Sequence, residues 1–401
     1  SLPVDPRWPT PDYQIPFINK TITIRANAHW GALLQYDNWL ADFDHKPLPK
    51  ASKAQLAALN TITKRIDADL LQAVKPLSKQ QIHKLLATGD KLTRYKNGQL
   101  KSVQMWRQME VYHRAKVDKK SLKLMEKSVL RFQTLGKHLL KLAQAYRHSN
   151  NDLLNQKLIK QFSTLVNHVI EQGYTRGSAA GVMHHQGYSL RQWSEAIFLG
   201  RNMLKDNLQA AQQTTSWLVG FGRIFRPKQE NFGFNVDVMN TFLPAMIMSA
   251  MLEQDDNKKV AYLNTMSQWM SYSMLATKGL AGGIQPDGSF YHHSQHYVAY
   301  GNGGLRGLAP VVYYIGATPF ALDKPAYQRL RLAVLKTRLF SNGLKTPMSL
   351  AGRHPEEYTT ITLAPFKYLS LMGDKIVAKA YLRLTQDKPT QLTKMLTGNG
   401  I

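Results

Sequence analysis

Histidine, tyrosine and arginine gather in three short segments of this 401-residue sequence, at 176–188, 287–300 and 350–355. Tyr300 and Arg353 stand in two of them, together with six of the 13 histidines: His184, His185, His292, His293, His296 and His354. An imidazole exchanges protons near neutral pH, a phenol can donate one, and a guanidinium stabilises an anion. This combination indicates acid–base chemistry on an anionic substrate.

A metal site and a serine nucleophile explain the same residues less well. The spacing of His293 and His296 would allow two metal ligands, but the sequence has no cysteine and no acidic cluster nearby. We therefore predict no metal ligands here. Ser294, beside His293, lacks the Gly-x-Ser-x-Gly context of a nucleophile elbow.

The residue types suit β-elimination at a uronic acid better than hydrolysis. A glycoside hydrolase requires two carboxylates at the cleavage point. Glu356 and Glu357 are adjacent and would point apart, while Asp287 lies in a Pro-Asp-Gly turn, where we expect it to form an Asx turn. Elimination needs a group that neutralises the substrate carboxylate, a base and an acid. The sequence therefore favours an enzyme that acts on acidic polysaccharides.

The charge also indicates a polyanionic partner. The chain has 52 Lys and Arg against 26 Asp and Glu, and residues 51–150 carry +15 of the net +26. Solvated, lysine-covered helices would give the same excess. We expect no nucleic-acid partner because no zinc finger, basic-aromatic RNA motif or heptad-backed basic helix occurs. No window approaches 18 consecutive apolar residues, so we expect no membrane partner.

Helical periodicity dominates the elements that must position the three segments. Apolar residues recur at three- and four-residue spacing over 122–146, 157–171, 193–208, 238–252, 259–274 and 327–340. We expect glycine-rich turns between helices, including Gly187, Gly301, Gly303 and Gly304, and core positions for Trp193, Trp217, Met239, Met246, Met248 and Met251. No convincing set of alternating strands is visible. The prediction is an all-α fold of helical hairpins, arranged as a toroid or a bundle.

The N-terminal 25 residues differ from the rest. Five prolines fall among the first 16 residues, so we predict an extended segment over 1–25 and a helical domain over 26–401. Ser1 is no initiator methionine, and no signal-peptide pattern follows it. We expect the chain to be a piece of a longer protein.

The three motifs together resemble a known family. Asp287-Gly-Ser-Phe-Tyr-His-His-Ser-Gln-His-Tyr-Val-Ala-Tyr300, Leu350-Ala-Gly-Arg-His-Pro355 and His184-His-Gln-Gly-Tyr188 resemble segments of the chondroitin sulfate ABC lyases of polysaccharide lyase family 8, and the exolyase branch is most similar. The resemblance runs in order over nearly the whole chain. It implies an incomplete α/α toroid of helical hairpins in a secreted or periplasmic bacterial enzyme.

The resemblance also implies roles for individual residues. It makes Tyr300 the catalytic tyrosine, His293 its histidine partner and Arg353 the catalytic arginine. His293 or Tyr300 would take the C5 proton, according to the uronate stereochemistry, and Tyr300 would protonate the leaving oxygen. The remaining candidates are expected to bind substrate: His185 and Asn240 at the uronate carboxylate, with His184, His292, His296, Tyr297 and His354 flanking.

The implied substrates are chondroitin sulfate, dermatan sulfate and hyaluronan, acted on by a monomer that requires no cofactor, with Ca²⁺ or Mg²⁺ left open. In the family, β-sandwich domains follow the toroid and one supplies a catalytic glutamate, whereas this chain stops at Ile401. We therefore expect weak or no activity from the chain alone. The alternative is a non-enzymatic helical domain that binds glycosaminoglycan or heparin through its charge and through Trp106, Trp193 and Trp217.

Overall fold

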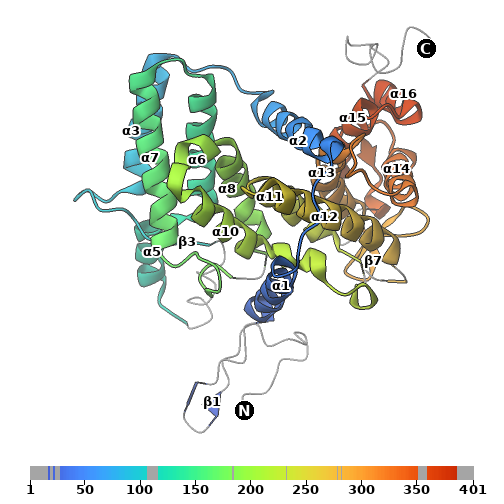
Figure 1. Ribbon diagram of the computed structural model, residues 1–401, viewed down its shortest axis with the longest axis horizontal. Coiled ribbons are helices and arrows are strands. Elements are labelled where there is room, and N and C mark those ends of the chain that lie inside the picture. The colour runs from blue at the N-terminus through green and yellow to red at the C-terminus, as the bar shows by residue number, and fades with distance from the viewer. Residues whose placement is uncertain are drawn as a thin grey trace. The chain divides into compact units, whose positions relative to one another are not determined.

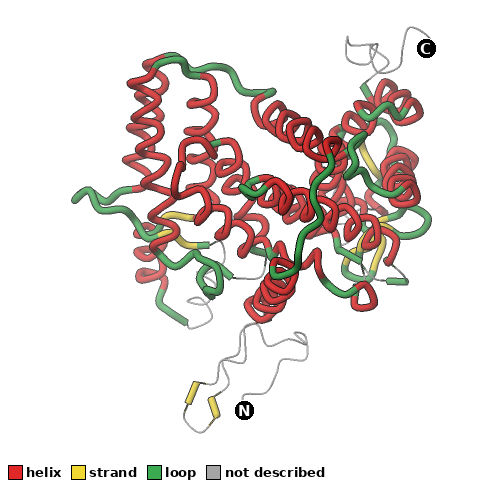
Figure 2. The backbone as a smooth tube through the Cα atoms, in the orientation of Figure 1, coloured by secondary structure: helices red, strands yellow, loops and turns green. Residues whose placement is uncertain are grey.

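Helices make up most of the described structure (Figures 1 and 2). The computed structural model describes residues 17–18, 21–22, 28–105, 116–182, 185–231, 233–277, 279–280, 282–350 and 359–385. Strands in this part of the chain are two or three residues long, so the predicted all-α class is confirmed. The chain divides into two compact units: unit 1 is Ser1–Pro47, Asp67–Phe225 and Met248–Gln254, and unit 2 is Leu48–Ile66, Arg226–Ile247 and Asp255–Ile401.

Unit 1 contains most of the helices of the N-terminal half. Its α-helices are α1 (Ala28–Asp44), α3 (Lys79–Thr93), α5 (Lys119–Ser128), α6 (Phe132–His148), α7 (Asp152–Glu171), α8 (Gly187–Leu199), α9 (Arg201–Leu204) and α10 (Leu208–Val219). The 3₁₀ segments are Lys205–Asn207 and Phe221–Phe225. The short strands are β1 (Phe17–Ile18) with β2 (Thr21–Ile22), and β3 (Val103–Gln104) with β4 (Leu130–Arg131).

The core of unit 1 forms where α6 packs against α7 and α8. Phe132, Phe162 and Trp193 are fully buried, and the indole of Trp193 donates to the Thr215 hydroxyl at 3.0 Å, which satisfies its only polar atom. A Cβ at Gly136 would lie 2.9 Å from the backbone nitrogen of Trp193. Glycine therefore allows α6 and α8 to approach backbone to backbone.

Unit 2 contains the C-terminal helices. They are α12 (Asp256–Ala276), α13 (Val298–Ile315), α14 (Lys324–Leu339), α15 (Ala364–Leu371) and α16 (Lys375–Leu384), preceded by 3₁₀ turn Lys228–Glu230 and π-helix Val238–Phe242. Its strands are β5 (Gly283–Ile284), β6 (Phe290–His292), β7 (Gln295–His296), β8 (Lys345–Thr346) and β9 (Thr359–Thr360), and Met348–Leu350 is a 3₁₀ turn. Helices α2 (Lys53–Leu71) and α11 (Leu243–Met251) contribute residues to both units.

The C-terminus of α13 is held by a cation from α2. One nitrogen of the Arg65 guanidinium donates to the carbonyls of Tyr313, Tyr314 and Gly316 at 2.9, 3.0 and 2.5 Å. The Tyr313 carbonyl also accepts from the Gly316 amide at 3.2 Å, and the positive charge of Arg65 complements the negative end of the helix dipole. Unit 2 thus anchors the end of the helix whose first turn carries Tyr300.

The structure confirms some of the predicted helices and corrects others. The stripes at 157–171, 259–274 and 327–340 lie within α7, α12 and α14, apart from Phe340, which follows α14. The stripe at 122–146 is instead two helices, because strand β4 interrupts it and pairs with β3 in parallel. That pairing depends on residues outside the stripe, which local periodicity does not reveal.

Two other predicted helices are also interrupted. The stripe at 193–208 spans α8, α9, the 3₁₀ turn at 205–207 and the first residue of α10, while 238–252 opens with a π-helix before α11. The glycine prediction was wrong at Gly301, Gly303 and Gly304, which lie inside α13, and Gly187 is the first residue of α8. Trp193, Trp217 and the four named methionines are buried, as predicted. Among the described helices, none combines the length and apolar character needed to cross a bilayer.

Candidate active site

A short antiparallel meander in unit 2 carries the segment 287–300. Strand β5 pairs with β6, and β6 pairs with β7, with His292 opposite Gln295. Helix α13 begins two residues after β7, so Tyr300 lies in its first turn. His292 and His293 therefore lie on the meander, and Tyr300 lies on the helix that directly follows it.

The turn between β5 and β6 accounts for Asp287. Its Oδ1 accepts from the Ser289 amide at 3.0 Å and from the Ser289 hydroxyl at 2.6 Å, which confirms the predicted Asx turn. The Ser289 hydroxyl is also the main cause that lowers the pKa of Asp287. The Asp287 carboxylate therefore has a structural role in the turn. The structure gives no support to Asp287 as one of two catalytic carboxylates of a glycoside hydrolase.

His293 lies in the two-residue turn between β6 and β7 and has an unusual backbone. Its φ is +51° and that of Ser294 is +60°, the left-handed values that a type I′ hairpin turn demands at both central positions. Asn-Gly is the common choice for such a turn, and each L-residue in this conformation costs about 1 kcal/mol or more. Backbone strain of this kind concentrates at functional sites. The turn leaves His293 exposed.

The rings of His293, His292 and Tyr300 form one cluster. The centroids of His293 and Tyr300 are 5.7 Å apart with the planes at 88°, and His292 stacks on Tyr300 at 4.4 Å. His292 and His293 are 4.1 Å apart. His293 is exposed and Tyr300 half-buried, whereas His292 is only 8% exposed. An accessible imidazole and an accessible phenol thus stand side by side.

A carboxylate approaches the buried member of this cluster. Asp237 Oδ2 lies 3.9 Å from His292 Nε2, close enough for an ion pair but longer than a hydrogen bond. Asp237 directly precedes the π-helix, and the sequence patterns did not select it. In the sequence, the only hint that Asp237 belongs to the site is its position three residues before Asn240. Nothing in the sequence links Asp237 to His292.

Tyr297 and His296 occupy different surroundings from His293. Tyr297 is fully buried, with its ring centroid 4.5 Å from that of Tyr300, and its hydroxyl has no hydrogen-bond partner among the described residues. His296 packs its ring against Phe340 at 5.2 Å. Burial is the main cause that lowers the pKa of His296, so this imidazole is neutral at pH 7.

Asn240 lies in the π-helix, a conformation often found at functional sites. The glycines of α13 make room for it: a Cβ at Gly303 would lie 3.2 Å from Asn240 Nδ2, and one at Gly307 would lie 2.2 Å from the carbonyl oxygen of Met239. These glycines therefore serve close packing of α13 on the π-helix. Asn240 is half-buried.

His185 belongs to unit 1 and shares the backbone feature of His293. Its φ is +61°, and its ring lies edge-on to Tyr188 with centroids 5.7 Å apart. It lies two residues before the first residue of α8. Its convergence with the rings of unit 2 on one sugar stays a prediction.

Three of the predicted site residues, His184, Arg353 and His354, lie outside the described residues. Of the predicted residues, the structure brings together His292, His293, Tyr297 and Tyr300. Across the described ranges, no three His, Asp or Glu side chains gather in a group that could hold a metal ion. Whether the protein binds Ca²⁺ or Mg²⁺ stays open, as in the sequence analysis.

Comparison with known proteins identifies relatives of this chain. Its residues 46–391 match the family described as "Lyase, catalytic". The chondroitin sulfate ABC exolyase of Proteus vulgaris is 33% identical over 96% of this chain and 40% of its own length, and that of Bacteroides thetaiotaomicron is 28% identical over 95% and 38%. An ABC endolyase of Proteus vulgaris is 25% identical over 87% and 36%. The chain thus spans about 40% of the length of its curated relatives.

Solved structures share the fold at low sequence identity. The chondroitin AC lyase of Streptomyces coelicolor A3 matches with a TM-score of 0.54 at 12% identity, over 83% of this chain and 46% of that one. A Paenibacillus xanthan lyase matches with a TM-score of 0.53 at 13% identity, over 86% and 34%. This likeness confirms the expected α/α-toroid fold. Because the family match covers most of the sequence, the chain belongs to the lyase catalytic-domain family, and the resemblance carried by its loop motifs is confirmed.

Proposed function

We propose that this chain is the catalytic helical part of a polysaccharide lyase that cleaves glycosaminoglycans by β-elimination. The observation that carries the proposal is the exposed imidazole of His293, edge-on to the half-buried phenol of Tyr300. One sugar ring can reach both groups, and each can exchange a proton. The similarity of the chain to chondroitin sulfate ABC lyases supports the same chemistry.

The proposed reaction breaks the bond between C4 of the uronate and the glycosidic oxygen. His293 or Tyr300 removes the C5 proton, and the electron pair left on C5 forms the C4–C5 double bond. The C4–O bond breaks, its electrons go to the oxygen, and Tyr300 protonates that oxygen. The products are a new reducing end and an unsaturated uronate, so no water and no oxidant enters.

The remaining roles follow from the resemblance. His185 and Asn240 would bind the substrate carboxylate, Asn240 as a neutral donor, which makes the C5 anion less unfavourable. The Arg353 guanidinium would bind a carboxylate, a sulfate or the glycosidic oxygen. Substrates would be chondroitin sulfate, dermatan sulfate or hyaluronan, with residues 26–401 as the catalytic domain after an extended segment over 1–25. We further propose a monomeric, secreted or periplasmic protein with no nucleic-acid or membrane partner.

Replacement of the phenol tests the proposal. Tyr300→Phe should lower the rate of unsaturated product, followed by its ultraviolet absorbance over long incubation, by about 100-fold or more, since acid–base catalysis contributes on that scale. The matched control is Tyr313→Phe, the same change on the same helix, whose ring packs on Tyr368. It should leave the rate unchanged.

Unsaturated product that the parent chain forms and Tyr300→Phe does not would decide against the alternative of a non-enzymatic glycosaminoglycan binder, which the net charge of +26 favours. A pure binder would hold chondroitin sulfate and give no product with the parent chain or either variant. Product formation at the parent rate by Tyr300→Phe would refute the role assigned to the phenol.

A further inference from the structure

A hollow between α3 and α7 in unit 1 has the features of a binding site that the catalytic proposal does not use. Its volume is about 250 Å³, and its lining comes from the last two turns of α3 and the middle of α7. This is below the range of about 300–1,000 Å³ typical of sites that enclose a whole small molecule. The size of the hollow suits one monomer of a polymeric ligand whose remaining monomers extend over the protein surface.

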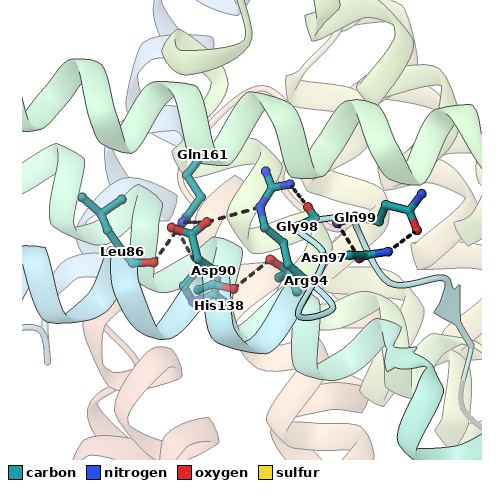
Figure 3. Close-up of polar contacts among 10 residues, drawn as sticks. Leu86, Asp90, Arg94, Asn97, Gly98, Gln99, His138 and Gln161 are labelled. Carbon is teal, nitrogen blue, oxygen red and sulfur yellow. Dashed lines mark hydrogen bonds and ion pairs between the residues drawn. The ribbon is translucent and has the colours of Figure 1, made fainter.

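Three polar contacts fix the side-chain amide of Gln161, which lines the hollow (Figure 3). Gln161 donates to the Leu86 carbonyl at 3.0 Å and to Asp90 Oδ1 at 3.1 Å. Its amide oxygen lies 3.0 Å from His138 Nε2. Since that oxygen only accepts, Nε2 carries the hydrogen, and burial lowers the pKa of His138 so that the ring is neutral. Every polar atom of the Gln161 side chain has a partner.

Gly89 makes this network sterically possible. A Cβ at this position would lie 2.3 Å from His138 Nε2 and 2.4 Å from Gln161 Oε1. Glycine inside a helix costs about 1 kcal/mol relative to alanine. The chain thus carries a locally unfavourable residue in α3 where the His138–Gln161 bond crosses that helix.

The rim of the hollow is cationic. Lys157 and Lys160 lie three residues apart on one face of α7, and neither has a carboxylate partner among the described residues. Arg94 is fixed by a 2.7 Å hydrogen bond to the Gly98 carbonyl, and its Nε lies 3.5 Å from Asp90 Oδ1. Three cations and one carboxylate thus line the hollow, which leaves an excess of positive charge.

The lining fits a ligand that carries both anions and hydroxyl groups. Lysine and arginine bind sulfate or carboxylate, while Asp90, whose side chain is 59% exposed, can accept a hydrogen bond from a hydroxyl. The described residues that line the hollow include no aromatic side chain, so they offer no stacking platform of the kind used for single-stranded nucleic acid. An acidic polysaccharide combines these features.

We propose that the hollow between α3 and α7 is an accessory site that binds an acidic polysaccharide, with a sulfate or carboxylate at Arg94, Lys157 and Lys160 and a sugar hydroxyl at Asp90. The proposal deepens the proposed function and rests on it for the identity of the polymer. The residues of the hollow belong to unit 1, whereas His293 and Tyr300 belong to unit 2. Binding at the hollow is measured apart from the chemistry in a variant that lacks the Tyr300 hydroxyl.

The first test removes two cations. Lys157→Gln/Lys160→Gln is made in the Tyr300→Phe background, so that the polymer stays intact, and its Kd for long chondroitin sulfate is measured at fixed salt. We expect a rise of about tenfold, which corresponds to about 1.4 kcal/mol. The matched control is Lys120→Gln/Lys123→Gln, an exposed pair with the same spacing on α5, and it should change Kd by less than about threefold. Equal losses in both double variants would overturn the proposal, as would no loss in either.

The second test asks whether removal of the Asp90 carboxylate strengthens or weakens the binding of chondroitin sulfate. Asp90→Ala removes one negative charge together with the hydrogen-bond acceptor, so a surface that attracts polyanions by charge alone must bind chondroitin sulfate more tightly. A site in which Asp90 accepts from a sugar hydroxyl must bind it more weakly, by about threefold or more. Tighter binding overturns the proposal, and so does equal sensitivity of duplex DNA binding to the Lys157/Lys160 pair.

Two further arms complete the design. Unsulfated hyaluronan distinguishes a carboxylate from a sulfate as the bound anion, because only the former is present in it. Thermal unfolding of each variant shows that the fold is retained. Loss of product with Tyr300→Phe is measured separately, so failure of the catalytic proposal and failure of the accessory site give different results.

Discussion

The imidazole of His293 meets the ring of Tyr300 at 88°, with centroids 5.7 Å apart, and it does so from a left-handed turn. The turn and the first turn of α13 come from one continuous segment, so the pair needs no long-range contact to meet. His293 is exposed, and both side chains can exchange a proton. Variants of this pair are therefore the most direct test of the proposed chemistry.

His293→Asn should separate chemistry from turn geometry. Asparagine tolerates the left-handed conformation, so the hairpin turn is retained while the imidazole is lost. We expect kcat on chondroitin sulfate to fall by about 100-fold or more, with an unchanged melting temperature. His83→Gln, on the exposed face of α3, is the control. An active His293→Asn enzyme would remove His293 from the mechanism.

Asp237 should act through His292 on the position of Tyr300. Asp237→Asn removes the charge that lies 3.9 Å from His292 Nε2 and should lower kcat about three- to tenfold, with little change in KM. Combined with Tyr300→Phe it should add no further loss, because the ring that it positions no longer has a hydroxyl. Asp256→Asn, at an exposed carboxylate that pairs with Lys259, is the control. Full additivity in the double variant would argue against a positioning role.

The glycines of α13 should differ in their tolerance of alanine. Gly307→Ala would place a methyl group 2.2 Å from the Met239 carbonyl, a backbone atom, and should lower the free energy of unfolding by about 1–3 kcal/mol. Gly304→Ala meets the Val236 side chain at 2.6 Å, which can rotate away, so the loss should be smaller. Denaturant unfolding of both variants measures the difference. The reverse order would contradict the close packing inferred for α13 and the π-helix.

Glu195 should make stability depend on pH. Burial, with a smaller contribution from Asp69, raises the pKa of Glu195 to about 7 against the opposing charge of Arg191. Below about pH 4.5 the carboxyl is protonated in both the folded and the unfolded chain. Between that pH and about 7 only the unfolded chain ionises, so stability falls as pH rises and stays reduced above pH 7.

Glu195→Gln should therefore stabilise the fold at pH 8, by about 2 kcal/mol, and change little at pH 4. Glu171→Gln, at the exposed end of α7, should show no such difference. Thermal unfolding across this pH range checks the prediction. Equal effects of Glu195→Gln at both pH values would show that ionisation of the Glu195 carboxyl does not cause the pH dependence of stability.

Local patterns in the sequence were sufficient for several features. The helical stripe at 157–171 predicted α7, and the Pro-Asp-Gly sequence predicted the Asx turn at Asp287, because both depend on residues within a few positions. The spacing of His293 and Tyr300 and the family motifs selected the candidate pair. Residue type and short-range spacing are enough for such features.

Only the tertiary structure decided the others. Gly301, Gly303 and Gly304 were predicted to form turns, yet they lie within α13. There the lost helix propensity is offset by close contact with Phe290 of β6 at Gly301 and with the π-helix segment at Gly303 and Gly304. The stripe at 122–146 splits because β4 pairs with a strand far away in sequence, and Asp237 meets His292 only through folding. Sequence alone determined which residues could do chemistry, but packing between distant segments decided their depth, partners and backbone conformation, since those interactions leave no local pattern.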